Sequence, residues 1–339
     1  MGEPRQLGVG VVGLGVGEQH ARAFAALADC RVMRVADHDR SRAEALAAEM
    51  PGCGVSNSFD EMLGDKSIDI VSIASFDADH YRQAVAAISA GKHVFVEKPL
   101  CRNGDELAHV ARLLRTAQRP IHVSSNLVLR GAALYTWLKR EIESGGFGRI
   151  YAFDGEYLYG RLHKITEGWR MDDENYSVVL GGGIHLIDLM LWLTGQRPET
   201  AVAVGNRIAT EGTAFSGLDF VTATLTFPTG LVGRLSCNFG CVHRHQHVVR
   251  IFGTRMTFVL DDAGPRIMKT RDPAVPASPV PLDPLPSHKG VLIPSFVKRI
   301  RSGAAMLANE LQQLLDPIAI ANACDAALTN RRSERIAYQ

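Results

Sequence analysis

The sequence contains no long hydrophobic run, no Cys-x-x-Cys pair and no excess of either charge. Its most apolar stretch, 177–193, includes three glycines, His185 and Asp188, so it is too short and too polar for a membrane span. The net charge of +1 favours neither nucleic acid nor an anionic membrane surface as a partner. The first residues lack the basic head and apolar core of a secretory signal. We therefore expect a cytoplasmic protein whose six cysteines are reduced.

Helical and strand patterns alternate through the first third of the chain. Its 339 residues, 46% of them hydrophobic and 22% charged, are enough for two globular domains. Repeated βα units with strongly apolar strands predict a doubly wound parallel sheet of the Rossmann type. The strands are predicted at 7–12, 31–36, 68–74, 94–96 and 121–124, and the helices at 18–27, 41–49, 79–90 and 104–117.

A glycine-rich turn follows the first predicted strand. It contains Gly13, Gly15, Val16 and Gly17, and a helix is predicted to begin directly after it. Glycines let the backbone approach a pyrophosphate, and the helix N-terminus supplies unpaired N–H groups. The usual spacing is Gly-x-Gly-x-x-Gly, whereas here Glu18 holds the third position. A turn without a ligand is the alternative.

Asp37 ends the second predicted strand, 24 residues after Gly13. An acidic residue at this point accepts hydrogen bonds from the adenosine ribose, which favours NAD over NADP. Arg40 and Arg42 lie close by and keep NADP as the alternative. Asp37 could instead serve only the local turn. His80 begins a later helix, where it either lines the cofactor groove or packs locally.

Lys98 follows a short apolar strand in the sequence Glu97-Lys98-Pro99. Its amine therefore stands at the carboxyl end of a strand of the parallel sheet, which is the edge where such sheets bind ligands. The proline after it keeps the lysine out of a helix. A solvated surface lysine is the alternative, but the glycine turn and a downstream glycine-histidine segment favour a functional role.

After about residue 150 the pattern changes to short strands separated by turns, which predicts a largely antiparallel sheet. The stretch 262–294 is rich in proline and lacks periodicity, so we expect a loop or an exposed arm there. The strands are predicted at 151–157, 201–204, 220–227, 231–237, 248–252 and 256–260, and the helices at 184–193, 295–301 and 317–328.

Three glycines, 181–183, precede His185 and Asp188 at the start of the 184–193 helix. A histidine suits general base catalysis, and a carboxylate three residues further on could orient it. The alternative is that His185 is only a hydrogen-bonded residue at the start of a helix and that Asp188 is an ordinary cap. Trp169 and Arg170 could stack on a sugar and hold a charged group, or they could be a core aromatic residue beside a surface arginine.

His243, His245 and His247 alternate, so in a strand they would share one face. Three histidines in this arrangement can bind a metal ion. No carboxylate lies close in the sequence, however, and alternation on a solvent-facing or interface strand explains the pattern equally well. We therefore predict no metal site.

In order and spacing, these motifs resemble the Gfo/Idh/MocA family of NAD(P)-dependent oxidoreductases. The resemblance covers nearly the whole chain. It includes the segments 13–15, 91–94, 97–99, 126–130, 169–170 and 182–188, together with Asp37.

The resemblance implies a Rossmann domain over 1–124 and a C-terminal α/β domain over 125–339 with a large open, mostly antiparallel sheet. That sheet usually forms the contacts of a homodimer or homotetramer. The resemblance also implies that Lys98 projects beside the nicotinamide and precedes a cis peptide bond. The implied cofactor contacts are Gly13, Gly15, Val16, Gly17, Asp37, His80, Glu97 and Lys98. The implied substrate contacts are Lys98, Arg130, Trp169, Arg170, His185 and Asp188.

Two positions depart from the family pattern. Many members carry an aspartate four residues before the histidine, and Gly181 stands there in this chain. His185 then needs another partner, and Asp188, Tyr176 and the substrate are the alternatives. The glycine loop is also one residue shorter before His20 than in many members.

We expect hydride transfer between NAD, or NADP as the alternative, and a hydroxyl carbon of a sugar, cyclitol or nucleotide-sugar. His185 is expected to act as the base, and Lys98 is expected to stabilise the negative charge that develops on the oxygen. Two other functions stay open. One is a sugar lyase or hydrolase that uses NAD in a transient redox step, and the other is a non-catalytic NAD-binding sensor. Neither nucleic acid nor a membrane is expected as a partner.

Overall fold

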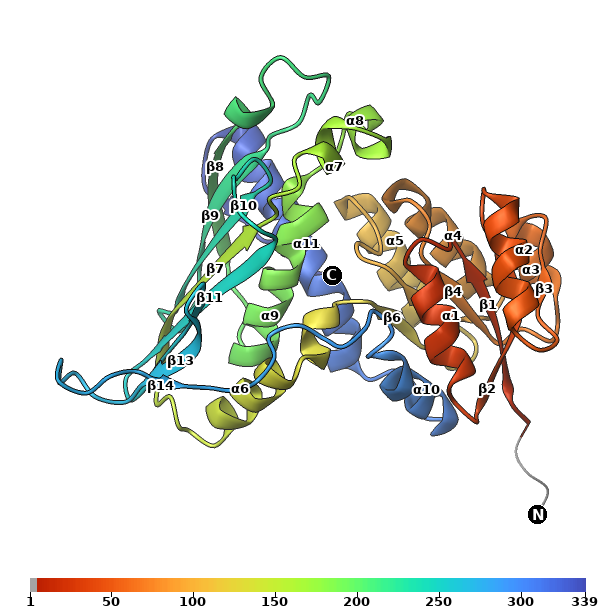
Figure 1. Ribbon diagram of the computed structural model, residues 1–339, viewed down its shortest axis with the longest axis horizontal. Helices are drawn as coiled ribbons and strands as arrows, with labels where there is room; N and C mark the ends of the chain where they lie inside the picture. The colour runs from red at the N-terminus through yellow and green to blue at the C-terminus, as the bar shows by residue number, and fades with distance from the viewer. Residues whose placement is uncertain (1–4) are drawn as a thin grey trace. The chain divides into compact units, whose positions relative to one another are not determined.

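The computed structural model describes residues 5–339, whose helices and strands are drawn in Figure 1. The chain forms two compact units, each with one β-sheet. The first unit comprises residues 5–128, Pro286–Leu315 and Gln339, and the second comprises Leu129–Leu285 and Asp316–Tyr338. The segment Pro286–Leu315 therefore groups with the first unit although it follows most of the second in the sequence.

The first unit contains a six-stranded sheet in the order β3-β2-β1-β4-β5-β6, in which every neighbouring pair is parallel. Parallel strands are covered on both faces, which agrees with the continuous apolar runs in the sequence. This arrangement confirms the predicted doubly wound Rossmann-type sheet. Its strands are β1 (Leu7–Val12), β2 (Cys30–Ala36), β3 (Gly54–Val55), β4 (Ile70–Ile73), β5 (His93–Val96) and β6 (Val123–Ser125).

Polar side chains start several helices of the first unit. Asp39, Ser58 and Asn103 each accept hydrogen bonds from backbone N–H groups of the following turn, where α2, α3 and α5 begin. The short elements β3 and α3 were not predicted. The helices are α1 (Gly17–Ala25), α2 (Arg40–Glu49), α3 (Phe59–Gly64), α4 (Asp77–Ser89), α5 (Gly104–Arg115) and α10 (Ile293–Arg301), and α11 (Ala308–Asn330) also begins in this unit.

Helix α10 completes the hydrophobic core of the first unit. The ring of Phe296 lies 5.5 Å from that of Phe95 on β5, and Phe95 in turn makes an edge contact with Phe24 on α1. Ile293 and Val297 are buried in the same cluster. A segment from the far end of the chain is therefore an integral part of the Rossmann-type unit.

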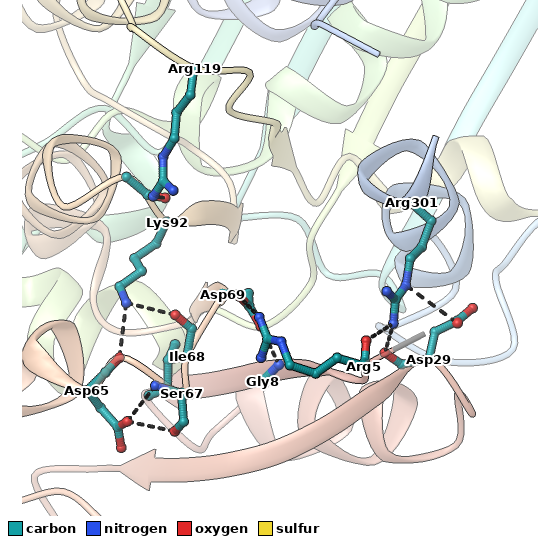
Figure 2. A network of polar contacts seen from close by, with 11 residues as sticks. Arg5, Gly8, Asp29, Asp65, Ser67, Ile68, Asp69, Lys92, Arg119 and Arg301 are labelled. Carbon is teal, nitrogen blue, oxygen red and sulfur yellow. Dashed lines mark hydrogen bonds and ion pairs between the residues drawn. The ribbon is translucent and has the colours of Figure 1, made fainter. Parts of the chain in front are cut away.

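Figure 2 shows a polar network at the amino-terminal ends of the parallel strands. Lys92 is 8% exposed, and its ammonium group donates to the carbonyl oxygens of Asp65 (3.0 Å) and Ile68 (2.7 Å). Burial lowers the pKa of Lys92. Arg301 of α10 donates to the carbonyl oxygen of Asp29 at 2.8 Å. Because ligands bind at the opposite, carboxyl edge of such sheets, we interpret this network as structural.

The second unit contains a nine-stranded sheet in the order β14-β13-β12-β11-β7-β10-β9-β8-β15. Among its described strands only β10 and β7 pair in parallel, which confirms the predicted open, mostly antiparallel sheet. Its strands are β7 (Ile150–Leu158), β8 (Thr200–Asn206), β9 (Phe220–Thr226), β10 (Val232–Asn238), β11 (Gln246–Gly253), β12 (Thr257–Asp261), β13 (Gly264–Met268), β14 (Ser278–Pro279) and β15 (Glu334–Arg335).

Helix α9 packs closely on this sheet because glycines leave room for it. A Cβ atom added to Gly155 of β7 would lie 3.2 Å from Leu186, and one added to Gly233 of β10 would lie 2.5 Å from the sulfur of Met190. The helices of this unit are α6 (Ala133–Glu143), α7 (His163–Thr166), α8 (Trp169–Asp172) and α9 (Ile184–Thr194), with a π-helical turn, η2 (Val179–Gly183), before α9 and 3₁₀ turns η1 (Val128–Gly131) and η3 (Ile208–Thr210).

Three predictions about the second half of the chain were wrong in part. The stretch 262–294 is not wholly a loop, because β13 and β14 extend the edge of the sheet. Helix α11 begins at Ala308 and contains Pro317, where the prediction began it. Strand β11 begins at Gln246, so of the three histidines only His247 lies in a strand. No helix among residues 5–339 is both long enough and apolar enough to cross a membrane.

Candidate active site

The glycine turn after β1 is shaped by close backbone packing. Gly13 has a φ of +79°, and a Cβ atom there would lie 2.4 Å from the carbonyl oxygen of Ala74. A Cβ atom on Gly15 would meet nothing within 4 Å, whereas one on Gly17 would press on Val11 at 3.2 Å. Gly13 is thus required by the fold, whereas a side chain at Gly17 would be crowded by Val11. Gly15 leaves open space beside the turn, as a phosphate-binding loop requires.

Val16 is the N-cap of α1, and its side chain accepts no hydrogen bond from the first turn. The amide groups of that turn therefore provide the positive end of a helix next to Gly15. Asp37 lies beside the same turn. Its carboxylate is 2% exposed and accepts hydrogen bonds from the backbone N–H groups of Leu14 (2.5 Å) and Asp39 (2.9 Å). Asp37 thus links the end of β2 to the glycine turn.

Lys98 stands at the carboxyl end of β5, where the sheet hydrogen bonding ends. The backbone N–H of Glu97 still donates to the carbonyl oxygen of Ile73 at 2.8 Å, and the peptide bond between Lys98 and Pro99 is cis. The side chain of Lys98 is half-buried. His80, which is 1% exposed, lies with one ring nitrogen 2.8 Å from the Pro99 carbonyl oxygen. The lysine is therefore held on a turn braced from α4.

His80 also contacts the carbonyl oxygen of Ser75 at 3.1 Å through its second ring nitrogen. Ser75 lies in the loop after β4, and Pro99 in the turn after β5. His80 therefore joins the loops of two neighbouring strands at the carboxyl edge of the sheet. Of the two interpretations of this histidine, local bracing of the loop that carries Lys98 is the one these contacts support.

A buried polar cluster lies next to Lys98. The carboxylate of Glu97 accepts a hydrogen bond from Asn126 at 2.6 Å and lies 3.2 Å from Nε2 of His20. His20 is fully buried, and its other ring nitrogen lies 3.1 Å from the hydroxyl of Ser72. Burial acts to raise the pKa of Glu97, but His20, Asn126 and the charge of Lys98 outweigh it and lower that pKa to about 2. The carboxylate is thus kept ionised.

His20, Ser72 and Asn126 were not predicted as site residues. A histidine on the buried face of α1, directly after the glycine turn, is a signal that the sequence does contain. The contact with Glu97, however, follows only from the order of the strands in the sheet.

In the second unit, His185 lies in the first turn of α9, directly after the π-helical turn η2. The hydroxyl of Ser177 accepts hydrogen bonds from the N–H groups of Val179 (3.1 Å) and Leu180 (3.2 Å) and donates to Asp325 of α11 at 3.0 Å. This capping fixes the start of the glycine segment. His185 is 8% exposed. Its position is therefore set by a well-anchored helix start.

Asp188 has a partner other than His185. Its carboxylate, which is 1% exposed, accepts two hydrogen bonds from Arg130: one from Nη2, and one from Nε at 2.9 Å. Burial raises the pKa of Asp188, and the charge of Arg130 opposes this. Arg130 and Asp188, both predicted to contact the substrate, therefore form a bidentate ion pair with each other.

Trp169, Arg170 and Tyr176 contact one another through their side chains. The guanidinium carbon of Arg170 lies 4.3 Å from the ring centre of Trp169, and its Nε atom donates to the hydroxyl of Tyr176 at 3.2 Å. Tyr176 is 7% exposed and makes edge contacts with Trp169 and Phe239. Arg170 is therefore held by two aromatic rings, and it is not a solvated surface arginine.

His185 also belongs to a larger aromatic cluster that the sequence did not predict. The ring of Tyr157 on β7 stacks on His185 with centres 6.4 Å apart, and it contacts His245 and His247, each at 5.2 Å. His243 points elsewhere and pairs with Asp262 at 3.1 Å. The three histidines therefore do not share one face, and His245 and His247 line the surroundings of Tyr157.

These features define a class of protein: one unit is a Rossmann-type domain with a glycine-rich turn after its first strand and a lysine at its carboxyl edge, and the other has a histidine-bearing helix on an open sheet. Residues 7–125 match the profile described as "Oxidoreductase family, NAD-binding Rossmann fold", and residues 135–259 match "GFO/IDH/MocA C-terminal domain". The chain therefore belongs to the GFO/IDH/MocA family, and its first unit contains the NAD-binding Rossmann domain of that family.

Several characterised proteins are similar to this chain. It is 32% identical to inositol 2-dehydrogenase 2 of Saccharopolyspora erythraea over 201 residues, which cover 58% of this chain and 56% of that protein. It is 26% identical to 2,7-anhydro-N-acetylneuraminate hydratase of Escherichia coli over 263 residues, 74% of this chain and 67% of the relative. For the inositol dehydrogenase, the chain thus spans little more than half of the relative's length.

Among solved structures, levoglucosan dehydrogenase in complex with NADH and levoglucosan has a TM-score of 0.85 to this chain. The two are 20% identical, and the superposition covers 98% of this chain and 100% of the other. At this identity the similarity establishes the fold.

Proposed function

We propose that this protein is an NAD-dependent oxidoreductase that transfers a hydride between the nicotinamide and a hydroxyl carbon of a sugar or cyclitol. The observation that carries the proposal is the half-buried Lys98 on its braced turn at the carboxyl edge of the Rossmann sheet. Membership of the family supports the same reaction class, and the related inositol dehydrogenase supports a polyol as the substrate class.

The residues around the glycine turn fit a dinucleotide. The open space beside Gly15 and the first turn of α1 suit a pyrophosphate, and Asp37 lies next to them at the end of β2. A carboxylate there favours the ribose hydroxyls of NAD and repels the additional phosphate of NADP. Bound NAD would supply the hydride acceptor.

The roles that we propose for the protein groups are those of acid–base chemistry. His185 takes the proton of the substrate hydroxyl, and Lys98 donates a hydrogen bond to the same oxygen as negative charge develops on it. Glu97, held ionised by His20 and Asn126, balances the charge of the neighbouring Lys98. Trp169 and Arg170 offer a stacking surface and a cation to a hydroxylated ligand.

The test is a steady-state assay of reduced nicotinamide formation with NAD or NADP and a panel of myo-inositol, scyllo-inositol, levoglucosan and glucose. Replacing Lys98 or His185 by alanine should lower kcat roughly 10²- to 10⁴-fold, whereas calorimetry should show that both variants still bind NAD. Lys66→Ala, at an exposed site in the same unit, is the matched control. Normal turnover in both the Lys98 and the His185 variants would refute these roles.

A second candidate function follows from Gly181 and from the related hydratase. It is elimination or hydrolysis on a sugar, with NAD oxidising and then re-reducing one carbon. In that case NAD should co-purify with the protein, and turnover should proceed with no net change in the absorbance of reduced nicotinamide.

We further propose that the protein assembles as a homodimer or homotetramer through its open sheet. One face of that sheet carries exposed valines on the two strands that flank β9, namely Val202 (46%) and Val204 (63%) on β8 and Val232 (38%) on β10. Val204→Asp should lower the molar mass measured by light scattering if this face is the interface. An unchanged mass would place the interface elsewhere. The six free cysteines are consistent with a reducing, cytoplasmic location.

A further inference from the structure

The hydroxyl of Tyr176 occupies the space in which a side chain at position 181 would begin. A Cβ atom built on Gly181 would lie 2.1 Å from Oη of Tyr176 and 2.6 Å from its Cζ. Only glycine leaves room for the tyrosine. We propose that Tyr176 is a further catalytic residue, whose hydroxyl donates a hydrogen bond to the substrate from the position where a side chain at 181 would otherwise reach. This inference rests on the proposed function, because it assigns a substrate contact beside His185.

Tyr176 is held firmly in this position. Its ring is in edge contact with Trp169, Phe215 and Phe239, at centre distances of 6.0–6.3 Å. Its hydroxyl accepts the hydrogen bond from Nε of Arg170 at 3.2 Å. A phenol oxygen that accepts from a guanidinium can still donate its own proton. The arginine thereby orients the group and makes it a better donor.

The backbone places the Tyr176 hydroxyl near the start of α9, where His185 lies. Gly181 lies in the π-helical turn η2, and His185 follows four residues later in the first turn of α9. Residues four apart in a helix lie on the same side, about one turn from each other. The capping by Ser177, backed by Asp325, fixes where that turn begins. A group that fills the space at Gly181 therefore lies one turn from the imidazole.

The neighbouring glycine supports a built site. A Cβ atom on Gly182 would lie 2.4 Å from the ring of Tyr157, the residue that stacks on His185. Two adjacent glycines thus each leave room for a tyrosine: Gly181 for Tyr176 and Gly182 for Tyr157. This pairing of small and large residues would not be needed if the glycines served only to bend the chain.

A tyrosine hydroxyl in place of the family aspartate changes the chemistry of the site. An aspartate at 181 would place a negative charge beside His185 and favour the protonated imidazole. The Tyr176 hydroxyl offers a neutral donor in its place, and Arg170 adds positive charge nearby. The site is therefore suited to a substrate oxygen that accepts hydrogen bonds next to the carbon that reacts, as in a polyol.

The first experiment compares Tyr176→Phe with the wild type on whichever polyol of the panel is turned over. We expect kcat to fall roughly 10²-fold, the usual loss for one positioned donor, with NAD affinity and melting temperature unchanged. Tyr135→Phe is the matched control, because Tyr135 is buried in the same unit and its hydroxyl has no hydrogen-bond partner. Turnover of Tyr176→Phe within about twofold of the wild type would overturn the inference.

The second experiment replaces the Tyr176 hydroxyl by a carboxylate at position 181 of the helix. The double variant Tyr176→Ala, Gly181→Asp removes the clash and should regain activity relative to Tyr176→Ala alone. Its carboxylate should raise the pKa of His185, which NMR titration of the unliganded protein measures without any turnover. An unchanged His185 pKa would show that position 181 does not reach the imidazole, and that result would also overturn the inference. Normal turnover of His185→Ala would instead refute the proposed function itself.

Discussion

The imidazole of His20 lies 3.2 Å from the carboxylate of Glu97, and both groups are enclosed at the carboxyl edge of the Rossmann sheet. Asn126 donates to the same carboxylate and lies 3.2 Å from the same imidazole. The charge on Glu97, directly before Lys98, is thus sustained by residues from α1 and from the loop after β6. A change at any one of the three positions should alter the electrostatic environment of the lysine.

We predict a pH-dependent loss of stability in Glu97→Gln. The pKa of Glu97 is lowered from 4.5 to about 2, so its charge stabilises the fold above pH 4.5, and this contribution is lost as the pH falls toward 2. The variant should lose about 3 kcal/mol at neutral pH and progressively less below pH 4.5. Urea unfolding followed by circular dichroism measures the difference. The exposed Glu143→Gln is the control, and an equal loss at every pH would contradict the prediction.

Asp325 gives the opposite pH dependence. Burial raises its pKa to about 6 from an ordinary 3.8, although the hydrogen bond from Ser177 opposes the shift. A raised carboxyl pKa means that the folded state loses stability as the pH rises from about 4 through 6. Asp325→Asn should therefore stabilise the protein by up to about 3 kcal/mol at pH 8, and the gain should vanish near pH 4. Thermal unfolding at the two pH values tests this.

Asp316 provides the matched comparison for Asp325. Its pKa is also raised to about 6 by burial, but it accepts hydrogen bonds from Arg197. Asp316→Asn would leave that arginine without its counter-charge, so it should not show the gain expected at Asp325. A similar gain in stability in Asp316→Asn and Asp325→Asn would show that the hydrogen bonds from Arg197 and Ser177 do not determine the effect.

Gly13 and Gly15 should respond differently to alanine. Gly13→Ala forces a Cβ atom against Ala74 at a positive φ, so it should lower stability by more than about 1 kcal/mol. Gly15→Ala meets no protein atom, so it should leave the melting temperature unchanged. Its methyl group would instead occupy the space proposed for the pyrophosphate and weaken NAD binding roughly tenfold or more. Unchanged NAD affinity in Gly15→Ala, measured by calorimetry, would exclude the turn as the phosphate site.

Arg130 and Asp188 should behave as a coupled structural pair. Arg130→Met leaves a buried carboxylate without its main counter-charge and should cost about 3–5 kcal/mol. The double variant Arg130→Met, Asp188→Leu removes both charges and should recover most of that loss. A double-mutant cycle by chemical denaturation measures the coupling. Additive effects would indicate that each residue serves the substrate separately.

Local patterns in the sequence predicted the elements that locate the site. The apolar run 7–12, between a polar start and a glycine turn, has the bounds of β1. A continuous apolar run is enough to predict this strand because nearly all of its residues are buried. Helix α6 was missed, although Leu134, Tyr135 and Leu138 form its buried face. Strands β13 and β14 were missed because proline-rich segments at a sheet edge lack alternation.

The partners of the site residues could not be predicted in the same way. Asp188 was expected near His185 because the two are close in the sequence, but its carboxylate is held by Arg130, which comes from before α6. The contact of His20 with Glu97 depends on the order of the strands in the sheet. Gly181 was recognised as unusual because it departs from the pattern of the family that the sequence resembles. That a tyrosine hydroxyl fills its space follows only from the coordinates.

The place of α10 in the first unit has a consequence for how the protein is made. A nascent chain that has emerged only as far as residue 128 holds all six strands of the Rossmann sheet, yet it leaves Phe95 and Phe24 without Phe296 beside them. The dinucleotide-binding unit can close its interior only when translation is nearly complete. Expression of the first 128 residues alone should therefore give an aggregation-prone fragment, whereas a fragment fused to 286–315 through a linker should be stable in solution.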